Sequence, residues 1–224
     1  MISLAIFDMA GTTINDRDEV YRVLREATER TGARYTDEQF QEWMGTEKKW
    51  AIRNLLELGG IQATEELVEE TWEWFRAELR RTYTENPPVP IDGVEDMLRE
   101  LRARDIRVAL TTGFNRETVD LILGSMGWSV GDLLDTTAAG DEVESGRPEP
   151  YLIRKVMAEL DVTDPDEVIS LGDTRADVIS AQRAGVRSVG VLTGHLTEEE
   201  FGELDADHVL ASSAELPGLL EELN

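Results

Sequence analysis

A short apolar run that ends in a carboxylate constrains the fold of this chain more than any other stretch. Residues 2–7 are apolar apart from Ser3, and Asp8, Gly11 and two threonines follow them closely. Such a run, bounded by turn residues, is typical of a buried strand in a parallel sheet. Open α/β sheets bind ligands at the carboxyl ends of their strands, where Asp8 could bind a cation or attack an electrophile. Gly11 would let backbone amides approach an anion closely. Taken alone, an Asp-x-x-Gly motif more often only starts a turn, so the rest of the chain has to decide.

Composition excludes several classes of site and partner. The 224 residues are 41% hydrophobic, enough for one large domain or a core with a smaller insert. The chain has no cysteine, which excludes disulfides and cysteine nucleophiles, and its two histidines are too few for a histidine-rich metal site. The net charge of −25 argues against nucleic acid or an anionic membrane as partner. Without a basic-flanked leader or a run of roughly 18 apolar residues, we expect a soluble, cytoplasmic protein.

The spacing of apolar residues changes from strand-like to helical after the first predicted strand. Strand-like runs are almost absent from residues 16–84, where helical spacing of apolar residues covers 18–30, 36–44, 48–58 and 64–83. Residues 85–88, Glu-Asn-Pro-Pro, break this pattern and are interpreted as a linker. We therefore predict an all-helical insert, residues 16–88, within a domain made of residues 1–15 and 89–224.

Strand-like and helical segments alternate after the linker. The predicted strands are residues 106–110, 168–171, 188–192 and 208–210, with a weaker candidate at 133–139. Alternating strands and helices indicate a parallel sheet covered on both faces. The predicted fold class is therefore α/β, a Rossmann-like doubly wound parallel sheet that carries an inserted helical domain.

Polar side chains follow several of these strands. Asp8, Thr112 and Asp173 each come after an apolar run, so a parallel sheet would bring them to one edge. Asp177 lies four residues beyond Asp173, a spacing at which like charges repel unless a cation lies nearby. Such carboxylates suit a magnesium ion that also holds a phosphoryl oxygen, and Arg147 could bind that oxygen or orient Asp8. Each residue alone has a simpler interpretation, a surface cation or a helix cap, but their order at strand ends indicates a site.

At these residues the sequence resembles the haloacid dehalogenase superfamily of aspartate-nucleophile phosphohydrolases. Four motifs match in order across nearly the whole chain, at residues 8–13, 112–113, 146–148 and 172–177. The insert, residues 16–88, resembles the superfamily's helical cap, and we call it the cap.

The resemblance implies a role for each of these residues. Asp8 would attack phosphorus to form an aspartyl-phosphate, which water then hydrolyses, while Thr112 and Arg147 hold the phosphoryl group. A magnesium ion would be bound by Asp8, the Ala10 carbonyl and Asp173, with Asp177 in support.

Two departures from the usual superfamily pattern narrow the family. Ala10 stands where most members that act on phosphate esters have a second Asp as the acid for the leaving alkoxide, and Arg147 stands where most have Lys. Both features, and residues 111–116, resemble phosphonoacetaldehyde hydrolases (phosphonatases), which cleave a carbon–phosphorus bond. Residues 44–48 resemble the cap segment of those enzymes that carries a Schiff-base lysine, here Lys48. The residues that this resemblance places against the substrate are Ala10, Gly11, Met44, Thr112, Gly113, Phe114 and Arg147.

Chemistry supports a role for Lys48. A carbon leaving group needs an electron sink, which an iminium supplies, and arginine cannot form one. Lysine is scarce, with only Lys48, Lys49 and Lys155 in the chain. We expect Thr46 to cap the helix that begins near Glu47, so that the helix dipole and desolvation lower the pKa of Lys48. The alternative is a solvated charge on a cap helix.

The sequence is compatible with three functions. The favoured one is a phosphonate hydrolase that uses Asp8 and Lys48. The second is a phosphate monoesterase, similar to phosphoglycolate phosphatases, that uses Asp8 without Lys48. The third is a non-catalytic protein that binds a phosphometabolite, and the intact motifs count against it. Ala51, Phe114 and Asp18 stand where phosphonatases usually have His, Tyr and Cys, which leaves the substrate open. A homodimer through the cap follows from the resemblance only.

Overall fold

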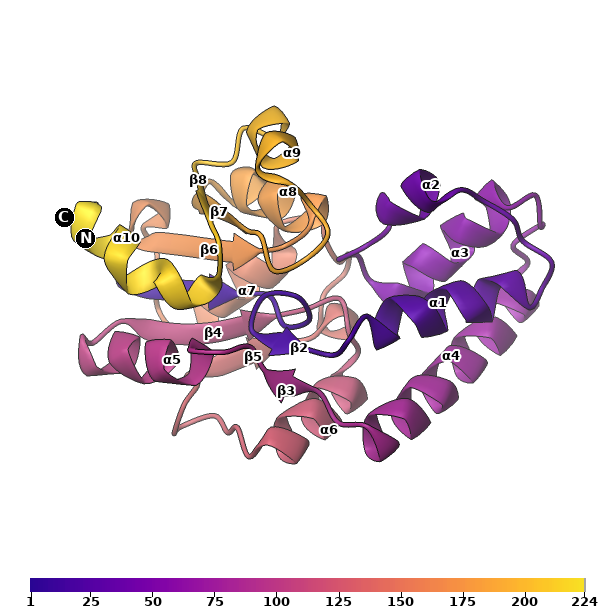
Figure 1. Ribbon diagram of the computed structural model, residues 1–224, viewed down its shortest axis with the longest axis horizontal. Helices are drawn as coiled ribbons and strands as arrows, with labels where there is room; N and C mark the ends of the chain where they lie inside the picture. Colours follow the sequence, from indigo (N-terminus) through magenta and orange to yellow (C-terminus); the bar gives the residue numbers. More distant parts are fainter. Residues whose placement is uncertain (224) are drawn as a thin grey trace.

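A six-stranded parallel sheet forms the centre of the molecule (Figure 1). The computed structural model describes residues 1–223. The strand order is β5-β4-β1-β6-β7-β8, so the apolar run at the N-terminus becomes a central strand with parallel neighbours on both sides. The strands are β1 (Leu4–Phe7), β4 (Arg107–Thr111), β5 (Thr136–Ala138), β6 (Val168–Gly172), β7 (Arg187–Val191) and β8 (His208–Leu210).

Four helices of the cap pack together beyond the carboxyl ends of the strands, on the side toward which the arrows in Figure 1 point. The helix α1 contacts both α3 and α4 through buried residues such as Val23 and Leu24, because its apolar side chains recur at helical spacing. The four helices are α1 (Glu19–Glu29), α2 (Asp37–Gln41), α3 (Lys48–Leu58) and α4 (Glu65–Glu85). The predicted helical insert is thus confirmed, while its division from the core at residues 16 and 88 stays a prediction.

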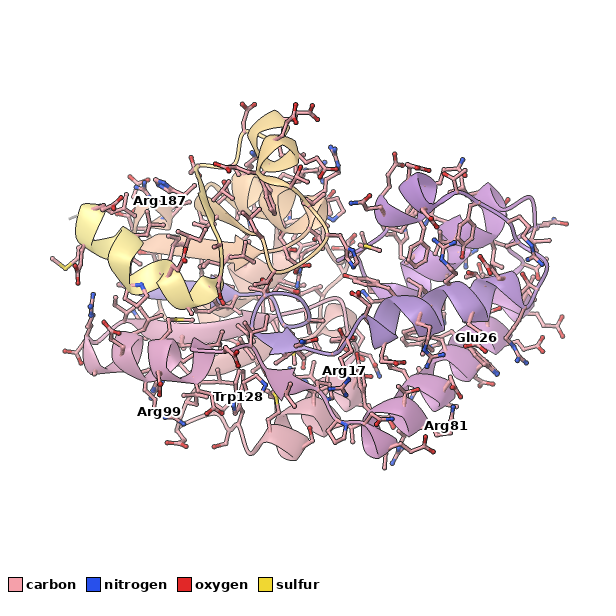
Figure 2. All side chains as sticks on the ribbon, viewed as in Figure 1. Arg17, Glu26, Arg81, Arg99, Trp128 and Arg187 are labelled. Carbon is pink, nitrogen blue, oxygen red and sulfur yellow. The ribbon has the colours of Figure 1, made fainter. Side chains whose placement is uncertain are left out.

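The two chain segments that connect the core with the cap pair with each other. β2 (Ile14–Asn15) and β3 (Val89–Pro90) form a short antiparallel ribbon. Arg17, labelled in Figure 2, donates from Nη2 to the carbonyls of Asn86 and Pro87, 3.0 Å each. The sequence predicted only a linker near these residues, because a pairing of two residues with two others leaves no periodic pattern.

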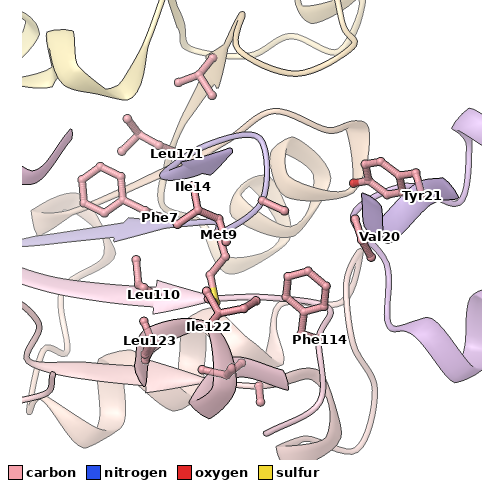
Figure 3. Close-up of a cluster of buried hydrophobic side chains, with 14 of the residues drawn as sticks. Phe7, Met9, Ile14, Val20, Tyr21, Leu110, Phe114, Ile122, Leu123 and Leu171 are labelled. Atoms are coloured by element: carbon pink, nitrogen blue, oxygen red, sulfur yellow. The ribbon is translucent and has the colours of Figure 1, made fainter. Parts of the chain in front are cut away.

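Helices cover both faces of the sheet, as predicted. Alternate residues of β1 face opposite sides, so Phe7 packs in a cluster with Leu110 and Leu171 (Figure 3), while Ile6 packs in another cluster. The first cluster includes α5 (Val94–Ala103), α6 (Arg116–Met126) and α10 (Leu216–Glu222). The second cluster includes α7 (Tyr151–Glu159) and part of α8 (Arg175–Ala184). The remaining short elements are α9 (Glu198–Glu203) and 3-10 turns at Gly140–Glu142, Pro165–Glu167 and Ser213–Glu215.

The α/β class and the parallel order are confirmed, and the differences lie at element ends. The helix predicted over residues 36–44 spans only Asp37–Gln41, because the chain turns before Gly45, whose φ is +74°. The weak strand at residues 133–139 is reduced to three residues. Within residues 1–223, no helix has both the length and the hydropathy needed to cross a bilayer.

Candidate active site

Three buried aspartates meet at the carboxyl edge of the sheet. Asp8 follows β1, Asp173 follows the neighbouring strand β6, and Asp177 lies in the first turn of α8. One carboxylate oxygen from each lies within 4.8 Å of the others. The three residues are almost inaccessible, with 6%, 2% and 6% exposure for Asp8, Asp173 and Asp177. The strand ends therefore converge as the sequence predicted.

Arg147 joins two of these carboxylates. Its Nη2 donates to Asp8 Oδ1 at 2.6 Å, and its Nη1 pairs with Asp177 Oδ1. Arg147 was expected either to bind a phosphoryl oxygen or to orient Asp8, and this contact fits the second role. The Nε of Arg147 is buried and has no hydrogen-bond partner among residues 1–223, so it remains a donor for an anionic ligand.

Burial opposes the ionisation of this cluster. Burial raises the pKa of Asp177 to about 6; Asp8 contributes to the rise, and Arg147 opposes it. Burial, followed by the charges of Asp8 and Asp177, also raises the pKa of Asp173 well above its ordinary value. A divalent cation would relieve both effects, and a set of carboxylate oxygens is the kind of ligand that hard cations prefer. The donor set therefore fits a metal ion.

Two threonine hydroxyls, whose roles the sequence did not predict, hydrogen-bond to Asp173 and to the backbone of Asp8. Thr12 Oγ1 donates to Asp173 Oδ1 at 2.9 Å, and Thr13 Oγ1 donates to the carbonyl oxygen of Asp8, also at 2.9 Å. Gly11 has a φ of +87°, and a Cβ there would lie 2.4 Å from Asp173 Oδ2. The only sequence signal for these roles was the position of the two threonines at the end of the motif that begins with Asp8.

Lys48 is buried in the same site. Its side chain is 4% exposed, and Nζ donates to the carbonyl of Thr46 at 2.8 Å. Burial lowers its pKa to about 8, against an opposing contribution from the Asp8 carboxylate. Nζ lies 5.7 Å from the centroid of the Phe114 ring. The structure thus contradicts the alternative of a solvated charge, whereas the neighbouring Lys49 is exposed and pairs with Glu69.

The expected cap of α3 is wrong. Glu47, not Thr46, is the N-cap, and its carboxylate accepts from the backbone amides of Lys49 at 2.9 Å and Trp50 at 2.7 Å. Thr46 Oγ1 instead donates to the carbonyl of Trp43 at 2.7 Å, because the chain turns between these residues. Lys48 still begins the helix, but burial, not the helix end, is the main cause of its low pKa.

Residues 43–47, which we call the cap loop, lie tightly against the core. A Cβ on Gly113 would lie 2.2 Å from the Thr46 carbonyl oxygen, and one on Gly146 would lie 2.7 Å from Glu47 Cβ. A Cβ on Gly45 would lie 2.1 Å from Thr174 Oγ1. These close approaches bring Lys48 to the edge of the sheet that carries Asp8.

The other predicted site residues surround this centre. The hydroxyl of Thr112, buried after β4, accepts from the backbone amide of Phe114 at 3.2 Å. A cavity of about 390 Å³ reaches Ala10 and Asp173 between core and cap. Met44 borders a smaller cavity of about 210 Å³ beside Asp173.

Comparison with known proteins decides the family. Residues 5–191 match the model of the haloacid dehalogenase-like hydrolases. The chain belongs to this family. This chain is 31% identical over 220 residues to a phosphonoacetaldehyde hydrolase of Bacillus cereus. The match covers 92% of this chain and 83% of the relative. A phosphonoacetaldehyde hydrolase of Bacteroides fragilis is 33% identical over 220 residues, with 84% and 83% of the two chains covered.

A solved structure supports the same fold. The phosphonoacetaldehyde hydrolase-like protein from Oleispira antarctica superposes with a TM-score of 0.84 at 24% identity, over 99% of this chain and 92% of that one. The resemblance inferred from the four motifs is therefore confirmed at the level of family and fold. The roles of individual residues stay predictions.

Proposed function

We propose that this hydrolase cleaves the carbon–phosphorus bond of phosphonoacetaldehyde or a closely related aldehyde phosphonate. The observation that carries the proposal is a lysine, Lys48, buried in the same site as the nucleophile candidate Asp8 with a pKa of about 8. A lysine with a lowered pKa supplies the neutral amine that adds to an aldehyde. The relatives named phosphonoacetaldehyde hydrolase support the same chemistry.

The first step forms an imine. The lone pair of Lys48 Nζ adds to the aldehyde carbon, and the carbonyl oxygen leaves as water after it has gained two protons, one from nitrogen and one from solvent. The product is a protonated imine, which draws electron density away from the carbon–phosphorus bond.

The second step transfers the phosphoryl group. The Asp8 carboxylate attacks phosphorus, and the electron pair of the carbon–phosphorus bond moves onto carbon to give a neutral enamine on Lys48. Water then cleaves the aspartyl-phosphate to release phosphate. Protonation of the enamine carbon and hydrolysis of the resulting imine release acetaldehyde and regenerate the amine.

The surrounding residues fit these steps. Arg147 orients Asp8 and offers its free Nε to a phosphoryl oxygen, with Thr112 as a second contact. Asp8, the Ala10 carbonyl and Asp173, with Asp177 in support, would hold a magnesium ion, which supplies positive charge to the phosphoryl oxygens. The methyl group of Ala10 suits a carbon leaving group, because no alkoxide has to be protonated there.

Substrate comparison and trapping of the imine test the proposal. With magnesium present, the protein should release phosphate and acetaldehyde from phosphonoacetaldehyde faster than phosphate from small esters such as phosphoglycolate. Borohydride added with phosphonoacetaldehyde should inactivate the protein and label Lys48, detected by peptide mass. Lys48→Arg should lose about 10³-fold or more in carbon–phosphorus cleavage, since arginine keeps the charge but cannot form the imine.

Lys49→Arg is the matched control, because Lys49 is exposed and should retain activity after the change. Asp8→Asn should abolish turnover of every substrate, because an amide is a far poorer nucleophile. If an ester is turned over much faster than the phosphonate, and equally well by Lys48→Arg, the protein is a phosphate monoesterase. If nothing is turned over, it is a binding protein.

A further inference from the structure

Tyr21 is a buried phenol beside Lys48 that the proposed steps do not use. It lies in the first turn of α1, is 9% exposed, and its ring centroid is 5.9 Å from Lys48 Nζ. On another side, the His195 ring packs edge-on at 6.0 Å, and His195 Nε2 lies 2.9 Å from Asp18 Oδ1. Contacts from the core and the cap thus fix the orientation of the Tyr21 ring.

The Tyr21 hydroxyl lacks an acceptor. The contacts of residues 1–223 give it no hydrogen-bond partner, whereas the hydroxyl of the other buried tyrosine, Tyr83, donates to Asp16 Oδ2 at 2.6 Å. Tyr21 lines the cavity of about 390 Å³ that reaches Asp173. Figure 3 shows its hydroxyl pointing away from α1 and toward the core. A donor held at such a cavity is available to a ligand.

Electrostatics keep this hydroxyl protonated. Burial, together with the charges of Asp173, Asp8 and two further aspartates, raises the pKa of Tyr21 well above its ordinary value. The group is therefore a neutral hydrogen-bond donor throughout the pH range in which the protein would work. Phe114, the other ring beside Nζ, has no such donor.

We propose that Tyr21 is a catalytic residue whose hydroxyl donates a hydrogen bond to the aldehyde oxygen of the substrate. This inference rests on the proposed function, in which Lys48 Nζ attacks the aldehyde carbon. Negative charge develops on the carbonyl oxygen during that attack, and a fixed donor on the ring that lies beside the attacking nitrogen stabilises it. The phosphoryl group lies with Asp8 and Arg147 in this scheme, so Tyr21 acts on the aldehyde end of the substrate.

The isosteric change Tyr21→Phe tests the proposal in two assays. Lys48 labelling by acetaldehyde and cyanoborohydride should slow about tenfold, and kcat/KM for phosphonoacetaldehyde should fall about tenfold. The inhibition constant of inorganic phosphate should change less than about twofold, because the phosphoryl contacts remain. A merely structural role of Tyr21 would weaken phosphate binding as well, so that result would overturn the proposal.

Tyr83→Phe is the matched control, since it removes a buried phenol hydroxyl that is already paired with Asp16. It should lower the melting temperature without slowing the labelling of Lys48. Equal labelling of the wild type and Tyr21→Phe would overturn the role of Tyr21 and leave the proposed function intact. If acetaldehyde does not label Lys48 in the wild type, the imine step fails and the Tyr21 proposal falls with it.

Discussion

At the scale of single residues, the site gathers charges that burial disfavours. Asp8, Asp173 and Asp177 share one buried pocket with two cationic side chains, those of Arg147 and Lys48. The carboxyl pKa values of Asp173 and Asp177 rise and the pKa of Lys48 falls, in each case chiefly because of burial. Each shift favours the neutral form, so a bound cation and an anionic substrate would both lower the cost of keeping these groups ionised.

Magnesium binding should therefore compete with protons. Because the pKa of Asp177 is about 6 in the folded protein, this carboxyl is largely protonated at pH 5 and largely ionised at pH 7. We expect the affinity for magnesium to fall about tenfold between pH 7 and pH 5, measured by titration calorimetry. The raised pKa of Asp177 should also make the metal-free protein lose stability as the pH rises from about 4 through 6, since the folded state gives up a proton that the unfolded chain has already lost.

Asp177→Asn provides the comparison for this prediction. The amide does not titrate, so the variant should bind magnesium more weakly at pH 7 but with a smaller pH dependence. Asp164→Asn, which alters an exposed carboxylate that caps a 3-10 turn, should behave like the wild type. An affinity that is the same at pH 5 and pH 7 in the wild type would contradict the prediction.

At the scale of elements, the contact between the cap loop and the core decides where Lys48 lies. Thr46 and Glu47 approach the backbone of Gly113 and Gly146 too closely for any side chain on those glycines. The loop leads directly into α3, so a displacement of the loop displaces the first residue of that helix, Lys48.

The substitution Gly113→Ala should push the cap loop away from the core. The new methyl group would lie 2.2 Å from the Thr46 carbonyl oxygen, which is backbone and has little room to move. We expect kcat/KM for the proposed substrate to fall at least about tenfold, because the attacking nitrogen is displaced, while circular dichroism remains unchanged.

Gly124→Ala in α6 is the control, because a Cβ there meets nothing within 4 Å. It should keep full activity and gain roughly 0.5–1 kcal/mol of stability, as expected for Gly to Ala inside a helix. If Gly113→Ala is as active as Gly124→Ala, the cap loop does not control the position of Lys48.

At the scale of the whole molecule, the balance of charge is strongly negative. The chain has 47 acidic and 22 basic residues, and ion pairs such as those of Arg76 and Arg80 with Glu117 join the cap helix α4 to α6 of the core. These side chains are between 42% and 69% exposed, so each pair contributes little to stability. The destabilising repulsion among the excess carboxylates should outweigh the stabilisation from these ion pairs.

Salt should therefore stabilise the protein. Raising sodium chloride from about 0.05 to about 0.5 M shortens the screening length, and we expect the melting temperature to rise by about 2–5 °C. The measurement uses chelated, magnesium-free buffer so that binding at the aspartate cluster does not contribute, and choline chloride should act like sodium chloride. A fall in melting temperature would mean that the attractive ion pairs dominate.

Local sequence patterns were sufficient to predict the sheet and the residues at its edge. The apolar run before Asp8, the run before Asp173 and the alternation of helices between them are local patterns, and parallel strands bring their carboxyl ends together whatever the details of packing. The four motifs, in order, were enough to identify the family, and the position of Lys48 in the cap was predicted from the same resemblance.

The contacts that hold these residues depend on the packing of the folded chain. The burial of Lys48, the capping of α3 by Glu47 and not Thr46, and the pairing of β2 with β3 all depend on contacts between segments distant in the chain or on the exact turn of a loop. Tyr21 occurs among apolar residues at helical spacing, so its pattern is that of a core residue. Its place beside Lys48 becomes visible only once the cap lies against the sheet, because proximity in space, unlike periodicity, is not encoded in neighbouring residues.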